Sequence, residues 1–134
     1  MRFSSPRSGP GLLPLLLGLG MLVFALLQLN DPDPLIWVSY YAAIACACTV
    51  AAYRPLPTVA FLGLAAVTAA GAVLTLPGFA DWILNRPTSD LWAPMSTERM
   101  YIEHSRELLG LVIAGTCLVT AHRQSRATAR RRSS

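Results

Sequence analysis

Two groups of polar and ionisable side chains could carry chemistry in this chain, and each borders a long apolar segment. The first group lies in and just before the turn Asn30-Asp31-Pro32-Asp33-Pro34, and the second lies just before an apolar stretch that begins at Leu108. Ionisable residues at membrane depth usually face a partner or a cavity, and carboxylates gathered there could bind a cation. The candidate residues for binding an ion or a partner are Gln28, Asn30, Asp31, Asp33, Glu103, Arg106 and Glu107, with His104 as a peripheral member.

The acidic turn also has a purely structural interpretation. Pro32 and Pro34 each disfavour helix at the residue before them, so Asp31 suits a turn. Asp33 suits the N-cap of a following helix, because proline is favoured at the first helical position. The sequence leaves the structural and the binding interpretations open.

The second group follows one face of a predicted helix. Glu103 and Glu107 are four residues apart, and their stripe continues to Gly110 and Ala114, two small residues typical of helix contacts. This spacing predicts that both carboxylates point into a helical bundle rather than into lipid. Arg106 could neutralise a nearby acid, and His104, which projects away from the stripe, suits an interfacial polar residue.

No familiar catalytic motif accompanies these groups. The sequence contains no nucleotide-binding loop, metalloprotease helix, serine nucleophile motif or paired CxxC. We therefore assign no catalytic residue, expect no cofactor and leave the identity of any metal open. Cys46 and Cys48 are two residues apart and would face different ways on a helix, so they and Cys117 are interpreted as small buried apolar residues.

The elements that must position these groups are membrane helices. Hydrophobic residues make up 54% of the 134-residue chain and charged residues only 13%, so lipid must cover much of the apolar surface. Spanning a bilayer takes roughly 20 apolar residues. The sequence predicts four spans, at about 12–29, 35–53, 59–76 and 101–121, in an all-α integral membrane four-helix bundle. Small residues in the second and third spans predict that these two form its packed centre.

The remaining segments complete a single-domain organisation. Residues 1–10 are predicted to be a disordered N-terminal tail, 11–122 the four-span domain and 123–134 a basic C-terminal tail. The third span is expected to stop at Pro77-Gly78, before a short interfacial helix around 79–84. The last helix is expected to start near Ser96 or Thr97, with Glu98 in its first turn, and to run to about Ala121.

Charge predicts the orientation. Eight of the eleven basic residues lie in the two tails and the second connection, whereas all seven acids lie in the other two connections. Basic residues near span ends favour the cytoplasmic side, so both termini are predicted to be cytoplasmic. A basic tail after a span typically sets topology and attracts anionic lipid, so no nucleic-acid partner is expected. All eleven basic residues are arginine, which favours a G+C-rich bacterium and hence a bacterial inner (cytoplasmic) membrane.

The acidic turn, Trp37 and Tyr41 after it, and the pattern Glu103-x-x-Arg106-Glu107-x-x-Gly110 together resemble the transmembrane 220 family. The resemblance covers roughly 12–53 and 98–121. It implies small multi-helix membrane proteins of unknown function, and so supports four spans without supplying an activity.

Three functional hypotheses follow. The first is a non-enzymatic binding or assembly protein in the lipid bilayer, whose acidic polar cluster at the outer face contacts a membrane protein partner or a second copy of the chain. The alternative is a small transporter or channel that uses the cluster to bind a cation. The third is a membrane-embedded carboxylate/His enzyme, which no nucleophile or metal-ligand spacing supports.

Overall fold

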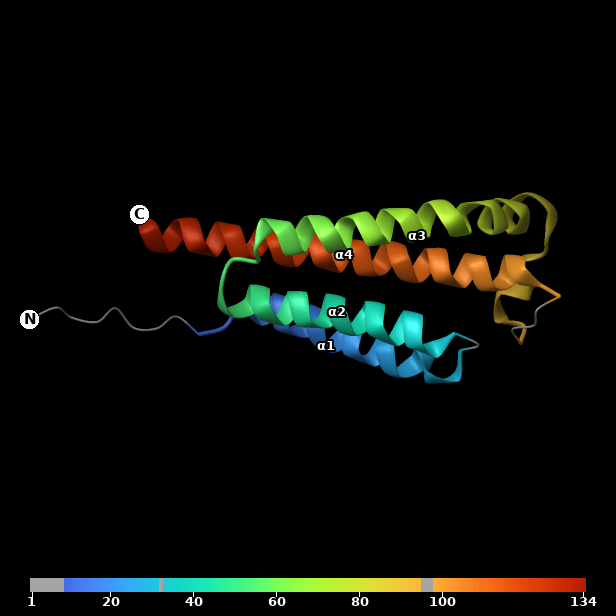
Figure 1. Cartoon of the computed structure of the whole chain (residues 1–134), viewed down its shortest axis with the longest axis horizontal. Coiled ribbons are helices and arrows are strands. Elements are labelled where there is room, and N and C mark those ends of the chain that lie inside the picture. The colour runs from blue at the N-terminus through green and yellow to red at the C-terminus, as the bar shows by residue number, and fades with distance from the viewer. Residues whose placement is uncertain (1–8, 32, 95–97) are drawn as a thin grey trace, which may run out of the picture. The chain divides into compact units, whose positions relative to one another are not determined.

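In a computed structural model, which describes residues 9–31, 33–94 and 98–134, the chain is all-α (Figure 1). Three helices are long and apolar enough to cross a membrane, over Leu12–Asn30, Pro34–Tyr53 and Thr58–Asn85. The fourth span and the side on which the termini lie stay predictions. The elements are α1 (Leu12–Leu27), η1 (Gln28–Asn30), α2 (Pro34–Tyr53), α3 (Thr58–Asn85), η2 (Thr88–Trp92) and α4 (Met100–Ser133).

The chain forms two compact units, and α4 runs through both. One unit comprises the chain up to Thr58 together with Cys117–Ser134, and the other comprises Val59–Thr116. The first unit therefore holds α1, α2 and the C-terminal half of α4. The second holds nearly all of α3, the connection after it and the N-terminal half of α4.

In the first unit, α1 and α2 form an antiparallel hairpin and lie side by side (Figure 1). Their contact is close at Gly18, where an added Cβ would lie 2.9 Å from the Thr49 hydroxyl oxygen and 3.1 Å from the Ala45 carbonyl oxygen. Ala47 and Ala51, two small residues of α2, are buried. The short proline-rich turn thus gives the tight helix pair that its sequence predicts.

In the second unit, α3 packs against the N-terminal half of α4. A Cβ added at Gly71 would lie 3.0 Å from a Leu111 methyl carbon, and one added at Gly78 would lie 2.5 Å from the His104 Cβ. Glycine therefore allows α3 to approach α4 at both positions, and at Gly78 it is required.

The predicted end of the third span is wrong. The helix does not stop at Pro77-Gly78 but continues as α3 to Asn85, with Pro77 inside it. The residues expected to form a separate interfacial helix, including Phe79 and Trp82, belong to α3. A proline removes only one backbone donor, and apolar surroundings favour a helix that keeps the rest of its backbone bonded.

The expectation that the second and third spans form the packed centre stays a prediction, because α2 and α3 belong to different units. Of the apolar window of α3, 6% is buried, against 44% for α2. Gly63 and Ala66, two of the small residues used in that prediction, are exposed. Small residues permit close helix approach but do not compel it, because lipid can cover the same surface.

The last helix differs from its prediction at both ends. It begins at Met100, two residues after Glu98, and continues to Ser133 instead of ending near Ala121. The expected caps Ser96 and Thr97 lie outside the described residues. The basic C-terminal segment is therefore helical, which is consistent with the high helix propensity of Arg and Ala and with favourable positive charge at a helix C-terminus.

Candidate functional site

The first candidate group surrounds the α1–α2 turn. Gln28 and Asn30 form η1, and the Asp31 amide donates to the Gln28 carbonyl over 3.0 Å. Asp33 occupies the N-cap of α2, followed by Pro34 at the start of the helix, as predicted. The Asp33 side chain is exposed and makes no capping hydrogen bond within the described part of the chain.

Asp31 differs from Asp33 in its surroundings. Among the described residues, its Oδ1 atom is buried and has no hydrogen-bond partner. A buried carboxylate oxygen without a donor is costly, because the protein has replaced its water without replacing its hydrogen bonds. Asp31 is therefore the acid of the turn whose position calls for a positively charged or hydrogen-bonding partner.

Four aromatic rings lie in the half of the hairpin next to the turn. Tyr41 is buried, and its ring centroid lies 5.6 Å from that of Phe24 and 6.2 Å from that of Trp37. Tyr40 packs 5.2 Å from Tyr41 in an edge-on arrangement. Such tilted contacts each add about 0.5–1.5 kcal/mol beyond burial. They fix the end of the hairpin that carries the acidic turn.

The second candidate group lies on the first turns of α4. Glu103, His104 and Glu107 are half-buried, whereas Arg106 is exposed. The stripe that they were predicted to continue is buried at both Gly110 and Ala114, so this face of α4 is a packing face. His104 contacts α3 at Gly78, which places it in the packing of the second unit as well as near the polar group.

The prediction that these two groups form one acidic polar cluster at the outer face stays a prediction. Gln28–Asp33 belong to the first unit, and Glu103–Glu107 belong to the second. No group of three or more His, Cys, Asp or Glu that could hold a metal ion occurs among the described residues.

A third polar group, which the sequence interpretation missed, joins α3 to the start of α4 in the second unit. The Tyr101 hydroxyl donates a 2.7 Å hydrogen bond to Asp90 Oδ2, and the Arg86 guanidinium carbon lies 4.6 Å from the centre of the Tyr101 ring. Arg86 also pairs with Asp81, with 3.4 Å between Nε and Oδ2, and Asn85 donates to the same carboxylate over 2.9 Å. We call these five residues the loop clamp.

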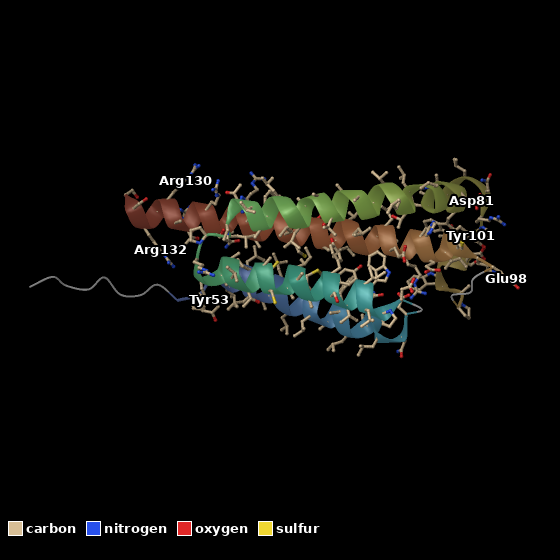
Figure 2. The ribbon with its side chains drawn as sticks, in the orientation of Figure 1. Tyr53, Asp81, Glu98, Tyr101, Arg130 and Arg132 are labelled. Atoms are coloured by element: carbon tan, nitrogen blue, oxygen red, sulfur yellow. The ribbon has the colours of Figure 1, made fainter. Side chains whose placement is uncertain are left out.

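The loop clamp lies at the end of the second unit where α3 gives way to α4, as Asp81 and Tyr101 show in Figure 2. It joins the first part of the connection between the helices, from Arg86 to Asp90, to α3 and α4. Trp82 adds a 3.3 Å hydrogen bond from its indole nitrogen to the Pro87 carbonyl. Trp92, at the end of η2, is 86% exposed. The clamp thus holds the segment around η2, whose last residue, Trp92, is an exposed aromatic side chain.

A sequence signal for the clamp existed. Asp81 and Asn85 are four residues apart, which places them on one face of a helix that continues to Asn85. The expected interfacial helix around 79–84 stopped one residue short of that pairing. The contacts of Arg86 and Asp90 with Tyr101 span 15 and 11 residues of chain, respectively, and have no local signature.

Comparison with known proteins identifies a family without an activity. The model of a family described as "Transmembrane family 220, helix" matches residues 21–123, which include both candidate groups and the loop clamp. No curated protein matches the chain. No solved structure matches it either.

Proposed function

The chain belongs to transmembrane family 220, and from that premise we propose that this multi-pass membrane protein is a non-enzymatic assembly protein. It crosses the membrane four times with both termini in the cytoplasm of a bacterial cell. Its acidic outer end serves as a structural latch, by which we mean that the carboxylates there make contacts that stabilise the fold and bind no ion. The connection Arg86–Arg99 contacts a partner in the same membrane.

The observation that carries this proposal is the loop clamp. Asp90 accepts a hydrogen bond from Tyr101, and Asp81 is neutralised by Arg86. These two acids of the proposed outer end are thus occupied by contacts that shape a connection, which supports a structural use of carboxylates here. A connection shaped in advance also loses less conformational entropy when it binds a partner than a free loop would.

The exposed Trp92 supports a partner for this connection. Tryptophan is enriched among the residues that dominate protein–protein interfaces. Its amphipathic ring also suits the membrane–water boundary. A partner that lies in the same membrane would meet Trp92 at that boundary.

The proposal of a fourth span is based on the middle of α4. From Leu108 to Ala121 the chain carries no charge, and Val112, Ile113 and Val119 are exposed, so lipid would cover them. A fourth crossing places the basic tails and Arg54 on one side. A three-span arrangement would place the C-terminal arginines on the opposite side from Arg54, against the positive-inside tendency.

Cation binding is the second candidate, and a specific observation favours it. Asp31 Oδ1 is buried without a hydrogen-bond partner among the described residues. A bound cation would satisfy that oxygen, and so would a basic side chain. We prefer a basic side chain, because transport of a bound cation would also require a pathway for charge through the apolar spans.

Photo-crosslinking in intact membranes tests the assembly proposal. A photoreactive residue in place of Trp92 should give one protein adduct of discrete mass, which mass spectrometry identifies as a second copy or as another membrane protein. The same residue in place of Leu76, an exposed apolar position on α3, is the matched control and should give lipid adducts. If position 92 gives only the lipid adducts of position 76, the connection has no protein partner.

A further inference from the structure

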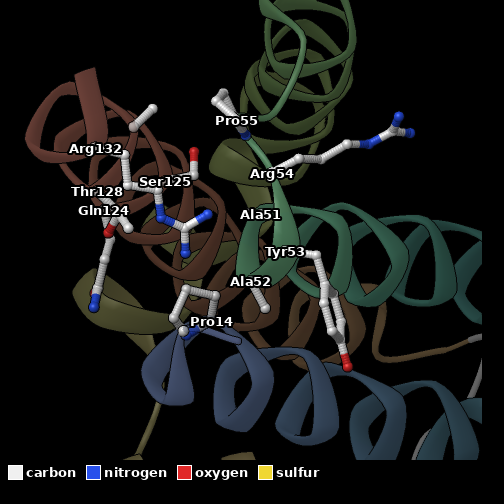
Figure 3. Close-up of a pocket in the computed structure, with 12 residues that line it drawn as sticks. Pro14, Ala51, Ala52, Tyr53, Arg54, Pro55, Gln124, Ser125, Thr128 and Arg132 are labelled. Carbon is white, nitrogen blue, oxygen red and sulfur yellow. The ribbon is translucent and has the colours of Figure 1, made fainter. Parts of the chain in front are cut away.

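A cavity of about 210 Å³ lies in the first unit where α1 begins and α2 ends (Figure 3). Three segments form its walls: the start of α1, the end of α2 together with Arg54 and Pro55, and the C-terminal part of α4. The lining residues that matter for binding are Gln124, Thr128 and Arg132 on α4, with Pro14 on α1 and Arg54 after α2.

The chemistry of this cavity favours an anion. The Arg132 guanidinium points into the cavity, whereas Arg54 points away from it (Figure 3). Thr128 and Gln124 add a hydroxyl and an amide. All seven acids of the chain lie between residues 31 and 107, outside the three lining segments. The cavity therefore offers positive charge and hydrogen-bond donors without a competing carboxylate.

The walls of the cavity are held in place by the protein itself. The Gly11 amide donates to the Ala52 carbonyl over 2.7 Å, which joins the start of α1 to the end of α2. The buried Ser125 hydroxyl accepts a 3.3 Å hydrogen bond from the Leu56 amide and donates to the His122 carbonyl over 2.8 Å. A cavity held by such bonds needs little rearrangement to bind a ligand.

The positive charge at this end of the unit comes from arginine and is present at every physiological pH. Burial, and to a lesser extent the nearby positive charge of Arg126, lower the pKa of His122, so this histidine adds little charge near neutral pH. Arg126 itself donates to the Thr58 hydroxyl over 3.1 Å. Arg132 is thus the cation that the geometry directs into the cavity.

We propose that this cavity binds the phosphate group of an anionic membrane lipid. A guanidinium matches phosphate oxygens with two parallel donors, and the N-terminus of α1 adds a favourable dipole. Basic pockets between membrane helices are suited to phosphate headgroups. Leu12 and Leu16, on the α1 turns next to the cavity, are 70% and 55% exposed and offer an apolar path for acyl chains. Those leucines favour a lipid over free phosphate.

The proposal is independent of any role of the acidic end, and single-charge variants test it. The full chain is purified in a neutral detergent, and its thermal unfolding is followed as phosphatidylglycerol, phosphatidylcholine or inorganic phosphate is added. Arg132→Gln removes the guanidinium from the cavity. Arg130→Gln is the matched control, because it removes the same charge from the same helix and Arg130 points to the other side of α4 (Figure 2). Thr128→Val removes a lining hydroxyl at constant charge.

We expect phosphatidylglycerol to raise the unfolding temperature of the parent saturably, and phosphatidylcholine to have little effect. Arg132→Gln should weaken the apparent affinity about tenfold, which corresponds to about 1.4 kcal/mol. Thr128→Val should weaken it to a smaller extent, and Arg130→Gln should leave it within about twofold. Without lipid, all three variants should unfold at the parent temperature.

Three results would overturn the proposal. Equal weakening by Arg130→Gln and Arg132→Gln would mean that anionic lipid is attracted by the charge of the helix as a whole. Equal stabilisation by phosphatidylcholine, which carries a phosphate but no net charge, would mean that the cavity does not select anionic lipids. Stabilisation by inorganic phosphate alone, at the same concentrations as the lipid, would assign the cavity to a free anion.

Discussion

The Tyr101 hydroxyl donates a 2.7 Å hydrogen bond to the Asp90 carboxylate, and so joins the first turn of α4 to the short helix η2. Arg86 lies over the same tyrosine ring and also pairs with Asp81 on α3. One aromatic side chain therefore connects both helices of the second unit to the connection between them. The order of that connection should depend on this ring and its hydroxyl.

Tyr101→Phe tests the hydroxyl alone, because it keeps the ring beneath Arg86. The variant loses the hydrogen bond to the Asp90 carboxylate and gains nothing in its place, so it should be less stable than the parent. The variant should unfold at a lower temperature in detergent and should expose the connection near Asp90 to proteolysis. Tyr53→Phe, at an exposed tyrosine, is the matched control and should behave as the parent. Equal behaviour of the two variants would show that the clamp contributes no stability.

Gly78→Ala tests the close approach of α3 to α4. The added methyl would lie 2.5 Å from the His104 Cβ, a contact that forces a backbone shift. Overpacking of this kind typically costs about 1–3 kcal/mol. Gly63→Ala is the control, since a Cβ at Gly63 meets nothing within 4 Å among the described residues and alanine favours helix.

The same pair offers a rescue experiment. His104→Gly removes the atoms that the new methyl meets, so Gly78→Ala should cost less in that background than in the parent. A double-mutant cycle on thermal unfolding measures this difference. Additive effects of the two substitutions would mean that Gly78 and His104 do not limit the approach of the helices.

The hairpin could be predicted from the sequence because its determinants are local. Two uncharged apolar runs surround a five-residue turn, and Pro32 and Pro34 fix where helix is excluded. Asp33 at the N-cap of α2 follows from the same rule. The end of α3 could not be predicted in this way, because the local effect of Pro77 is outweighed by the benefit of a continuous helix in apolar surroundings.

The candidate site was predictable only in part, for a related reason. The residues that line one helix face, such as Glu103 and Glu107, follow from a period of 3.6. The contacts of Tyr101 depend on where a fourteen-residue connection folds back, and no local pattern specifies that. The basic cavity exists because α4 continues past Ala121. That continuation was not predicted, because the charged residues after Ala121 were interpreted as a tail.

Topology is the next prediction. Reporter fusions after Arg54 and after Gln124 should report the cytoplasm, and a fusion near Thr88 should report the periplasm, because eight of the eleven arginines flank the proposed inner ends. The measurement compares alkaline phosphatase and green fluorescent protein activities at each position. A periplasmic reporter after Gln124 would leave three spans and end the four-span proposal.

Arg106 is predicted to pair with a carboxylate among Asp31, Asp33, Glu103 and Glu107. An unpaired arginine at the centre of a membrane helix costs roughly 2.5–3.5 kcal/mol, and less near the interface. Arg106→Leu should therefore lower the unfolding temperature in detergent by leaving an acid without its partner. Arg123→Leu, an exposed arginine on the same helix, is the control. An unchanged unfolding temperature for Arg106→Leu would show that the pairing does not matter.

The most direct test of the account is thermal unfolding of the parent, Asp31→Asn and Glu107→Gln in detergent across a panel of monovalent and divalent cations. If the acids are a latch, each neutral variant should unfold at a lower temperature than the parent, and no cation should stabilise the parent specifically. A cation site predicts the opposite, because like charges held together repel until the ion binds. A ligand at one hundred times its dissociation constant adds about 2.7 kcal/mol. A saturable stabilisation by one cation, lost in both variants, would contradict the latch and favour cation binding.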